Sequence, residues 1–78
     1  MVVSVQSRQF QFPLNISYQE FLPYYRGEVN KVEVVDSKGQ TLWVNAKHFR
    51  PFLTSNGIRA YFCMTIDGQG NLISLKKY

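Results

Sequence analysis

The stretch AKHFRPFLTSNG, residues 46–57, decides how the two halves of this 78-residue chain are joined. In it Arg50 precedes Pro51, and a residue before proline is pushed out of the α region. A helical turn that begins near Asn45 or Ala46 must therefore end there. We interpret the stretch as a corner between two pairs of strands.

The apolar residues of this corner fit the same interpretation. The short turn ends near Arg50 and Pro51. The apolar side chains on either side of this point can then enter the core: Phe49, Phe52 and Leu53. Asn56 and Gly57 then supply a tight turn into the next strand. This link resembles, by analogy, the one-turn corner of SH3-like barrels.

A functional interpretation competes with the corner. Lys47, His48 and Arg50 could form a small anion site, because the guanidinium fork of arginine suits phosphate or carboxylate. In the corner interpretation, Arg50 instead donates to carbonyl groups of the corner and His48 is simply exposed. We favour the corner.

A strand and a short helix are predicted before this corner. The stretch RQFQFPL, residues 8–14, alternates large apolar and polar side chains, which is typical of a half-buried strand, and Pro13 indicates that the strand lies at a sheet edge or ends there. Ser17 and Glu20 form a capping box, so a helix should run from about residue 18 to 25 and end at Gly27.

Two hairpins are predicted around the corner. The first joins residues 29–35 to TLWVNA, residues 41–46, through the turn DSKG, and the second joins RAYFCMTID, residues 59–67, to LISLKKY, residues 72–78, through the turn DGQGN. Alternation assigns the following side chains to the inner face: Val32, Val34, Leu42, Val44, Ala60, Phe62, Met64, Ile66, Ile73 and Leu75.

These elements predict one small α+β domain over residues 1–78. We expect a five-stranded antiparallel sheet, or a small SH3-like open barrel, with one short N-terminal helix between strands 1 and 2. Within the helix, Pro23 predicts a kink or a partly 3-10 segment because it removes a backbone hydrogen bond.

Composition favours a folded protein of the cytoplasm. The chain is 45% hydrophobic and 18% charged, with a net charge of +4 from scattered basic residues. Disordered chains lack this much apolar surface. The single cysteine, Cys63, excludes an internal disulfide framework, and the sequence contains no apolar run long enough for a signal peptide or a membrane span. We therefore expect no membrane association.

Catalytic chemistry finds little support in the sequence. A dyad of Cys63 and His48 is conceivable, but a thiol in the middle of a strand is usually inert. No pair of carboxylates is placed for acid–base catalysis, and the glycines of the turns do not form a phosphate loop. We expect no enzyme activity, no cofactor and no metal site.

The outer side of the central strands offers the more promising surface. The candidate interaction face consists of Trp43, Tyr61, Lys31, Arg59 and Val35. Exposed Trp, Tyr and Arg are enriched at protein interfaces, so we expect protein–protein interaction or self-association.

Two alternatives stay open for this face. Rings interleaved with cations also stack the bases of RNA and of single strands, although Glu33 within the patch weakens this interpretation. Alternatively, the helix or the closure of a barrel covers the rings.

The chain also resembles a family of short, uncharacterised bacterial proteins, domain-of-unknown-function family no. 2835. The resemblance lies in NISYQEFLPYYRGEVNKVEV and FRPFLTSNGIRAYFCMTID, from about residue 10 onward. Two residues depart from the family's pattern, Pro23 and Trp43. The resemblance implies a free-standing small protein but no activity, cofactor or partner. It is carried by these residues: Tyr24, Tyr25, Gly27, Val29, Arg50, Pro51, Phe52, Thr54, Gly57, Ile58 and Asp67.

Overall fold

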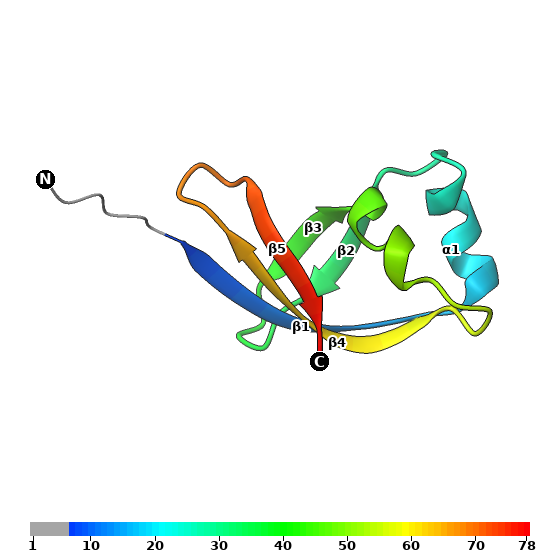
Figure 1. Cartoon of the computed structure of the whole chain (residues 1–78), viewed down its shortest axis with the longest axis horizontal. Helices are drawn as coiled ribbons and strands as arrows, with labels where there is room; N and C mark the ends of the chain where they lie inside the picture. Colours follow the sequence, from blue (N-terminus) through cyan, green and yellow to red (C-terminus); the bar gives the residue numbers. More distant parts are fainter. Residues whose placement is uncertain (1–6) are drawn as a thin grey trace, which may run out of the picture.

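The computed structural model describes residues 7–78 of the chain. Five strands, one α-helix and two short 3-10 turns follow one another along it (Figure 1). In chain order they are β1 (Arg8–Ile16), α1 (Tyr18–Tyr25), β2 (Lys31–Val35), β3 (Thr41–Asn45), η1 (Ala46–His48), η2 (Arg50–Phe52), β4 (Ile58–Ile66) and β5 (Leu72–Lys77). Within residues 7–78, no helix is long and apolar enough to cross a membrane.

All five strands are antiparallel, as predicted, but they form two sheets. One sheet has the order β1-β4-β5, and the other consists of β2 and β3, so residues 7–78 contain no closed barrel. The expectation of one five-stranded sheet is thus corrected. The two sheets stay separate because β2 approaches β1 at one end. There the Ser37 N–H donates to the Gln11 carbonyl at 2.8 Å, but no ladder of hydrogen bonds forms between β1 and β2.

The two sheets share one core. The β2–β3 hairpin lies against one face of the β1–β4 pair (Figure 1). Val32, Val34 and Val44 of the hairpin enter the same buried cluster as the side chains of the larger sheet. Since both inner faces meet there, the outward side chains of the two sheets point away from each other.

Phenylalanines dominate this core. Phe12 of β1 and Phe62 of β4 stack with ring centroids 5.9 Å apart, and Phe49 packs edge-on against Phe62 at 5.3 Å. Phe52 packs against Phe62 from η2 at 5.1 Å. Such aromatic pairs add about 0.5–1.5 kcal/mol each beyond the area that they bury. The corner is therefore held to the larger sheet by ring packing.

The alternation of the strands is confirmed with one exception, Ile73. Trp43 is 62% exposed and Tyr61 58% exposed, as outward residues should be. Ile73, predicted to be buried, is 55% exposed. The register shifts between Thr65 and Ile66, so that Leu72 pairs with Ile66, Ser74 pairs with Thr65 and Ile73 is the extra residue of a β-bulge.

Helix α1 begins and ends as predicted. The Ser17 hydroxyl accepts from the Glu20 N–H at 3.1 Å, and the Glu20 carboxylate accepts from the Ser17 N–H at 3.0 Å. At the other end Gly27 takes a φ of +80°, and the Glu28 N–H donates to the Pro23 carbonyl at 2.9 Å, which completes a Schellman motif. The helix is α-helical through Pro23, so the expected 3-10 segment is absent.

The stretch 46–57 forms the predicted corner, but Arg50, which was expected to end the helical turn before Pro51, begins a second 3-10 turn. Elements η1 and η2 are two successive 3-10 turns, and Phe49 between them is fully buried. Thr54 and Gly57 then close a tight turn with reciprocal backbone hydrogen bonds of 2.9 and 3.0 Å. Gly57 has a φ of +92°, and a Cβ at this position would lie 2.1 Å from the Ile16 carbonyl oxygen.

We expect Gly57→Ala to lower the free energy of unfolding by more than about 2 kcal/mol, because it adds a backbone clash to the strain of a left-handed residue. The matched control is Gly39→Ala, where φ is +83° but nothing lies within 4 Å of the added carbon. The control should cost only about 1–2 kcal/mol. Urea unfolding measures both, and equal losses would contradict the close approach of Gly57 to the start of α1.

Candidate functional site

The structure divides the predicted interaction face between two surfaces. Trp43, Lys31 and Val35 belong to the outer face of the β2–β3 hairpin, where Trp43 lies opposite Glu33. Tyr61 and Arg59 belong to the outer face of the three-stranded sheet. Because the inner faces of the two sheets share one core, these two outer faces lie on opposite sides of the protein. The five residues are therefore not brought together.

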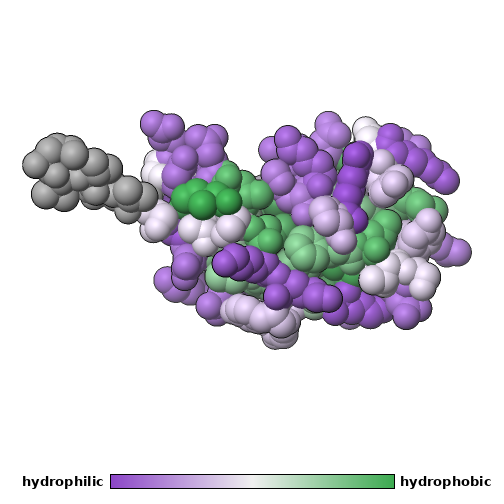
Figure 2. Space-filling view, in the orientation of Figure 1, coloured by the Kyte–Doolittle hydropathy of each residue, from purple (hydrophilic) through white to green (hydrophobic). Residues whose placement is uncertain are grey.

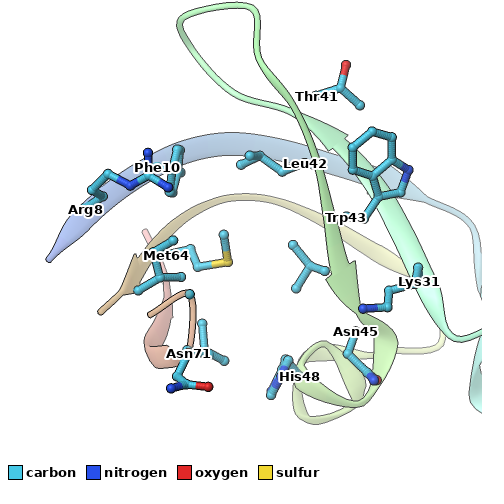
Figure 3. Close-up of a pocket in the computed structure, with 14 residues that line it drawn as sticks. Arg8, Phe10, Lys31, Thr41, Leu42, Trp43, Asn45, His48, Met64 and Asn71 are labelled. Carbon is cyan, nitrogen blue, oxygen red and sulfur yellow. The ribbon is translucent and has the colours of Figure 1, made fainter. Parts of the chain in front are cut away.

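A groove of about 500 Å³ opens between β3 and the turn that joins β4 to β5. This volume lies within the range of about 300–1,000 Å³ that is usual for ligand pockets. Apolar side chains make up much of its lining, and Figure 3 shows Phe10, Leu42 and Met64 around the opening. A band of apolar side chains also runs along the middle of the molecule in the space-filling view (Figure 2).

The rim of the groove is polar and basic. Arg8 stands at the β1 end, where its guanidinium carbon lies 5.5 Å from the centre of the Phe10 ring. Lys31 and His48 line the groove at its other end, and the amino group of Lys31 points toward it in Figure 3. No Asp or Glu is among the lining residues of the described chain. The groove therefore favours an anionic or acidic occupant.

His48 adds no charge to this rim at neutral pH. Burial lowers the pKa of His48 below its usual 6.5, and the nearby Lys47 lowers it further. Burial and a like charge both disfavour the imidazolium form. The positive field of the groove at pH 7 thus comes from Arg8 and Lys31.

The edge of β3 borders the groove along the whole strand. Five consecutive residues, 41–45, line it, including the outward-facing Thr41 and Trp43. A strand whose inner and outer residues both line a groove presents its edge to that groove. Among residues 7–78, β2 is the one strand that pairs with β3.

The register shows which backbone groups are free at this edge. The Asp36 N–H donates to the Gln40 carbonyl, and the Ala46 N–H donates to the Asn30 carbonyl. In an antiparallel pair hydrogen-bonded residues alternate, so Leu42 and Val44 bond to β2. The N–H and C=O groups of the intervening residues, Thr41, Trp43 and Asn45, point to the open edge.

The other strand edges carry features that discourage pairing. In β1, Pro13 and the bond to Ser37 restrict the edge, because Pro13 has no N–H to donate and the Gln11 carbonyl already accepts a hydrogen bond. In β5, the bulge at Ile73 and the two lysines, Lys76 and Lys77, have the same effect. The sequence TLWVN of β3 contains no charge, proline or bulge. Among the edge strands of residues 7–78, which are β1, β2, β3 and β5, it is the one without a charge, a proline or a bulge.

The structure does not bring the three residues of the predicted anion site together. His48 lines the groove, whereas Lys47 and Arg50 do not. Arg50 instead donates from Nη2 to the Tyr25 carbonyl at 3.1 Å, and its guanidinium carbon lies 5.3 Å from the centre of the Tyr25 ring. It thereby supplies a cation to the C-terminus of α1, whose last turn has none of its own. The prediction that Arg50 donates to carbonyls of the corner was therefore wrong, because the acceptor lies at the end of α1.

The described residues bring no other catalytic or metal-binding group together. Cys63 points outward from β4, while His48 lines the groove, so thiol and imidazole lie on different sides of the sheet. Within residues 7–78, no group of three or more His, Cys, Asp and Glu side chains could hold a metal ion.

Some residues of these surfaces were missed in the sequence. Arg8 lines the groove because it has the same parity as Phe10 and Phe12 in β1, and this parity was readable from the sequence. Tyr78 lies beside Tyr61 because its N–H donates to the Tyr61 carbonyl at 3.0 Å. That contact depends on the β4–β5 register, which the bulge at Ile73 conceals.

Comparison with known proteins identifies the family. A family model described as "Protein of unknown function (DUF2835)" matches residues 8–78, nearly the whole chain. The chain belongs to this family. Neither the curated proteins nor the solved structures include a significant match.

Several residues that carry the resemblance to DUF2835 have a structural role here. Gly27 closes the Schellman motif, Arg50 binds the end of α1, and Gly57 closes the corner against β1. The Asp67 carboxylate accepts from the N–H groups of Gln69 and Asn71 in the second hairpin turn. Backbone hydrogen bonds from Asn71 and Gln69 lower the pKa of Asp67. These roles account for the fold and assign no activity.

We expect Arg50→Ala to lower the free energy of unfolding by about 1 kcal/mol, because it removes a hydrogen bond and a cation–π contact at the end of α1. Lys47→Ala is the control, since it removes the same charge from the exposed side of η1. Chemical unfolding measures both variants. Equal stability of Arg50→Ala and wild type would contradict the structural role of Arg50.

Proposed function

We propose that the protein is a small non-enzymatic binding module that takes an extended segment of a protein partner at the open edge of β3. The observation that carries this proposal is the unpaired and uncharged edge of β3, with Trp43 62% exposed at its centre. Such an edge is a template for an added strand. An exposed Trp that becomes buried on binding is also a frequent energetic centre of protein interfaces.

Strand addition would use the whole site at once. The free N–H and C=O groups of Thr41, Trp43 and Asn45 would bond to the added backbone. Alternate side chains of the added strand would then face the apolar groove, and the others would lie beside Trp43 on the outer face. Backbone bonds would supply affinity and the groove would supply selectivity.

Charge determines which partner fits best. Arg8 and Lys31 border the groove, and no acidic residue of the described chain lines it. A partner segment with carboxylates therefore complements the rim. A second copy of this chain would bring another net charge of +4 to the same place. We therefore favour an acidic partner over self-association, which competes for the same edge.

The arrangement of the strands supports an open site. The hydrogen bond between Ser37 and Gln11 brings the end of β2 close to β1, while β2-β3 and β1-β4-β5 remain two separate sheets. We describe this as an SH3-like barrel opened between β3 and β5. An added strand at β3 would narrow the opening. We also propose a cytoplasmic location, since one cysteine provides no disulfide framework.

The nucleic-acid alternative gains no support at this surface. Glu33 pairs with Trp43 on the outer face of the hairpin, and its carboxylate would repel phosphates beside the indole.

We expect an alternating valine–glutamate peptide to bind and to change the emission of Trp43, the single tryptophan of the chain. The matched probe, an alternating valine–lysine peptide, has the same strand pattern but should bind at least about tenfold more weakly because of the basic rim. Fluorescence titration at low salt measures both. Equal binding of the two peptides, or binding of neither, would contradict the proposal.

The edge itself is tested by a pair of substitutions at one position. Thr41→Pro removes an N–H that faces the open edge and leaves the β2–β3 ladder intact, whereas Thr41→Val keeps that N–H. We expect only the proline variant to lose affinity, by about fivefold or more. Sedimentation of the free chain is the further control: a concentration-dependent dimer that Thr41→Pro abolishes would assign the edge to a second copy.

A further inference from the structure

The outer face of the three-stranded sheet forms a second surface, on the side opposite to Trp43. The register aligns its outward side chains in rows across β1, β4 and β5. The central row consists of Pro13, Tyr61 and Tyr78, since Tyr61 pairs with Pro13 and accepts the N–H of Tyr78. Tyr61 is 58% exposed and Tyr78 is 65% exposed. Two exposed tyrosines are therefore neighbours, one in β4 and one directly after the end of β5.

Cations lie on both sides of this row. Arg59 precedes Tyr61 by two residues on β4, and Lys76 pairs with Cys63 two residues beyond it. Residues two apart on a strand share a face and lie about 7 Å apart. The tyrosines are therefore flanked along the sheet by positive charge.

Within residues 7–78, the three strands contribute no acidic side chain to this face. The outward residues of these three strands are Gln9, Gln11, Pro13, Asn15, Arg59, Tyr61, Cys63, Thr65, Ser74, Lys76 and Tyr78. Glu33, which weakened a nucleic-acid interpretation of the predicted face, lies on the hairpin at the opposite side. The division into two sheets thus separates Tyr61 from Glu33.

Arg59 is held in place at the margin of this face. Its Nε donates to the Asn56 carbonyl at 3.3 Å, and its Nη1 donates to the Asn15 side-chain oxygen. The neighbouring carboxylate, Glu20, is bound in the capping box: the Ser17 hydrogen bonds lower its pKa, and Arg59 lowers it slightly further. The guanidinium thus keeps a fixed position beside the row of rings.

We propose that this face binds single-stranded nucleic acid, with Tyr61 and Tyr78 stacking on bases and with Arg59 and Lys76 contacting phosphates. Exposed rings on a sheet surface stack on unpaired bases, and flanking cations follow the phosphate backbone. The amide and hydroxyl side chains around the rings can bond to base edges. This face suits a protein partner less well, because its apolar surface consists mainly of Pro13 and the two tyrosine rings.

The proposal predicts binding of a labelled oligouridine at low salt, measured by fluorescence anisotropy on the full chain. Log affinity should fall linearly with log salt, with a slope of about −1.4 for two phosphate contacts at about −0.7 each. A duplex of mixed sequence should bind more weakly, because its bases are already stacked. Undetectable binding at low salt, or equal binding of duplex and single strand, would overturn the proposal.

Substitutions assign the site. Tyr61→Ala should lower affinity by roughly 5- to 150-fold, which corresponds to about 1–3 kcal/mol for one stacked base, whereas Tyr61→Phe keeps the ring and should bind as wild type. The exposed position of Tyr61 means that neither change opens a cavity in the core. An unchanged affinity in Tyr61→Ala, or equal losses in the alanine and phenylalanine variants, would overturn the stacking role.

Two matched controls separate this site from the β3 edge and from overall charge. Trp43→Ala changes the opposite surface and should leave oligouridine binding unchanged. Lys76→Gln should make the salt slope less steep by about 0.7, while Lys38→Gln, which removes the same charge from the β2–β3 turn, should not. Loss of binding in Trp43→Ala, or equal effects of the two lysine variants, would place the nucleic acid elsewhere and contradict the proposal.

Discussion

Side-chain packing, rather than a continuous backbone ladder, joins the two sheets of this protein. Phe12, Phe49 and Phe62 lie ring against ring, and the valines of the β2–β3 hairpin enter the same core. The one backbone bond between β1 and the β2–β3 turn is the bond from Ser37 to Gln11. Because ring packing fixes the hairpin without a ladder, β3 can end the fold with its outer edge unpaired.

This arrangement gives the protein two different surfaces. The edge of β3 borders an apolar groove with a basic rim, which suits an extended acidic segment. The outer face of the larger sheet is aromatic and basic, and its three strands carry no Asp or Glu side chain on that face, which suits single-stranded nucleic acid. The inner faces of both sheets are buried in the core, so the two outer surfaces stay separate. Each proposal can therefore be tested independently of the other. Together they would allow the protein to contact a protein partner and a nucleic acid at the same time.

Local patterns in the sequence predicted most of the fold. The capping box at Ser17 and Glu20, the glycine at the end of α1 and the alternation in β4 each depend on residues that are close together in the chain, and each was confirmed. The features that were missed depend on contacts between distant residues. The partner of Arg50 is Tyr25, 25 residues away, and the exposure of Ile73 follows from a bulge in its pairing with β4. Alternation shows that Trp43 and Tyr61 both face outward, but it does not show that their sheets face opposite ways.

Amide hydrogen exchange along β3 in the free protein tests the central claim most directly. The account predicts alternation: slow exchange at Leu42 and Val44, whose N–H groups bond to β2, and fast exchange at Thr41 and Trp43, whose N–H groups face the open edge. Equal protection of Trp43 and Val44 would show that another strand, from this chain or a second copy, already occupies the edge. That result would contradict the account.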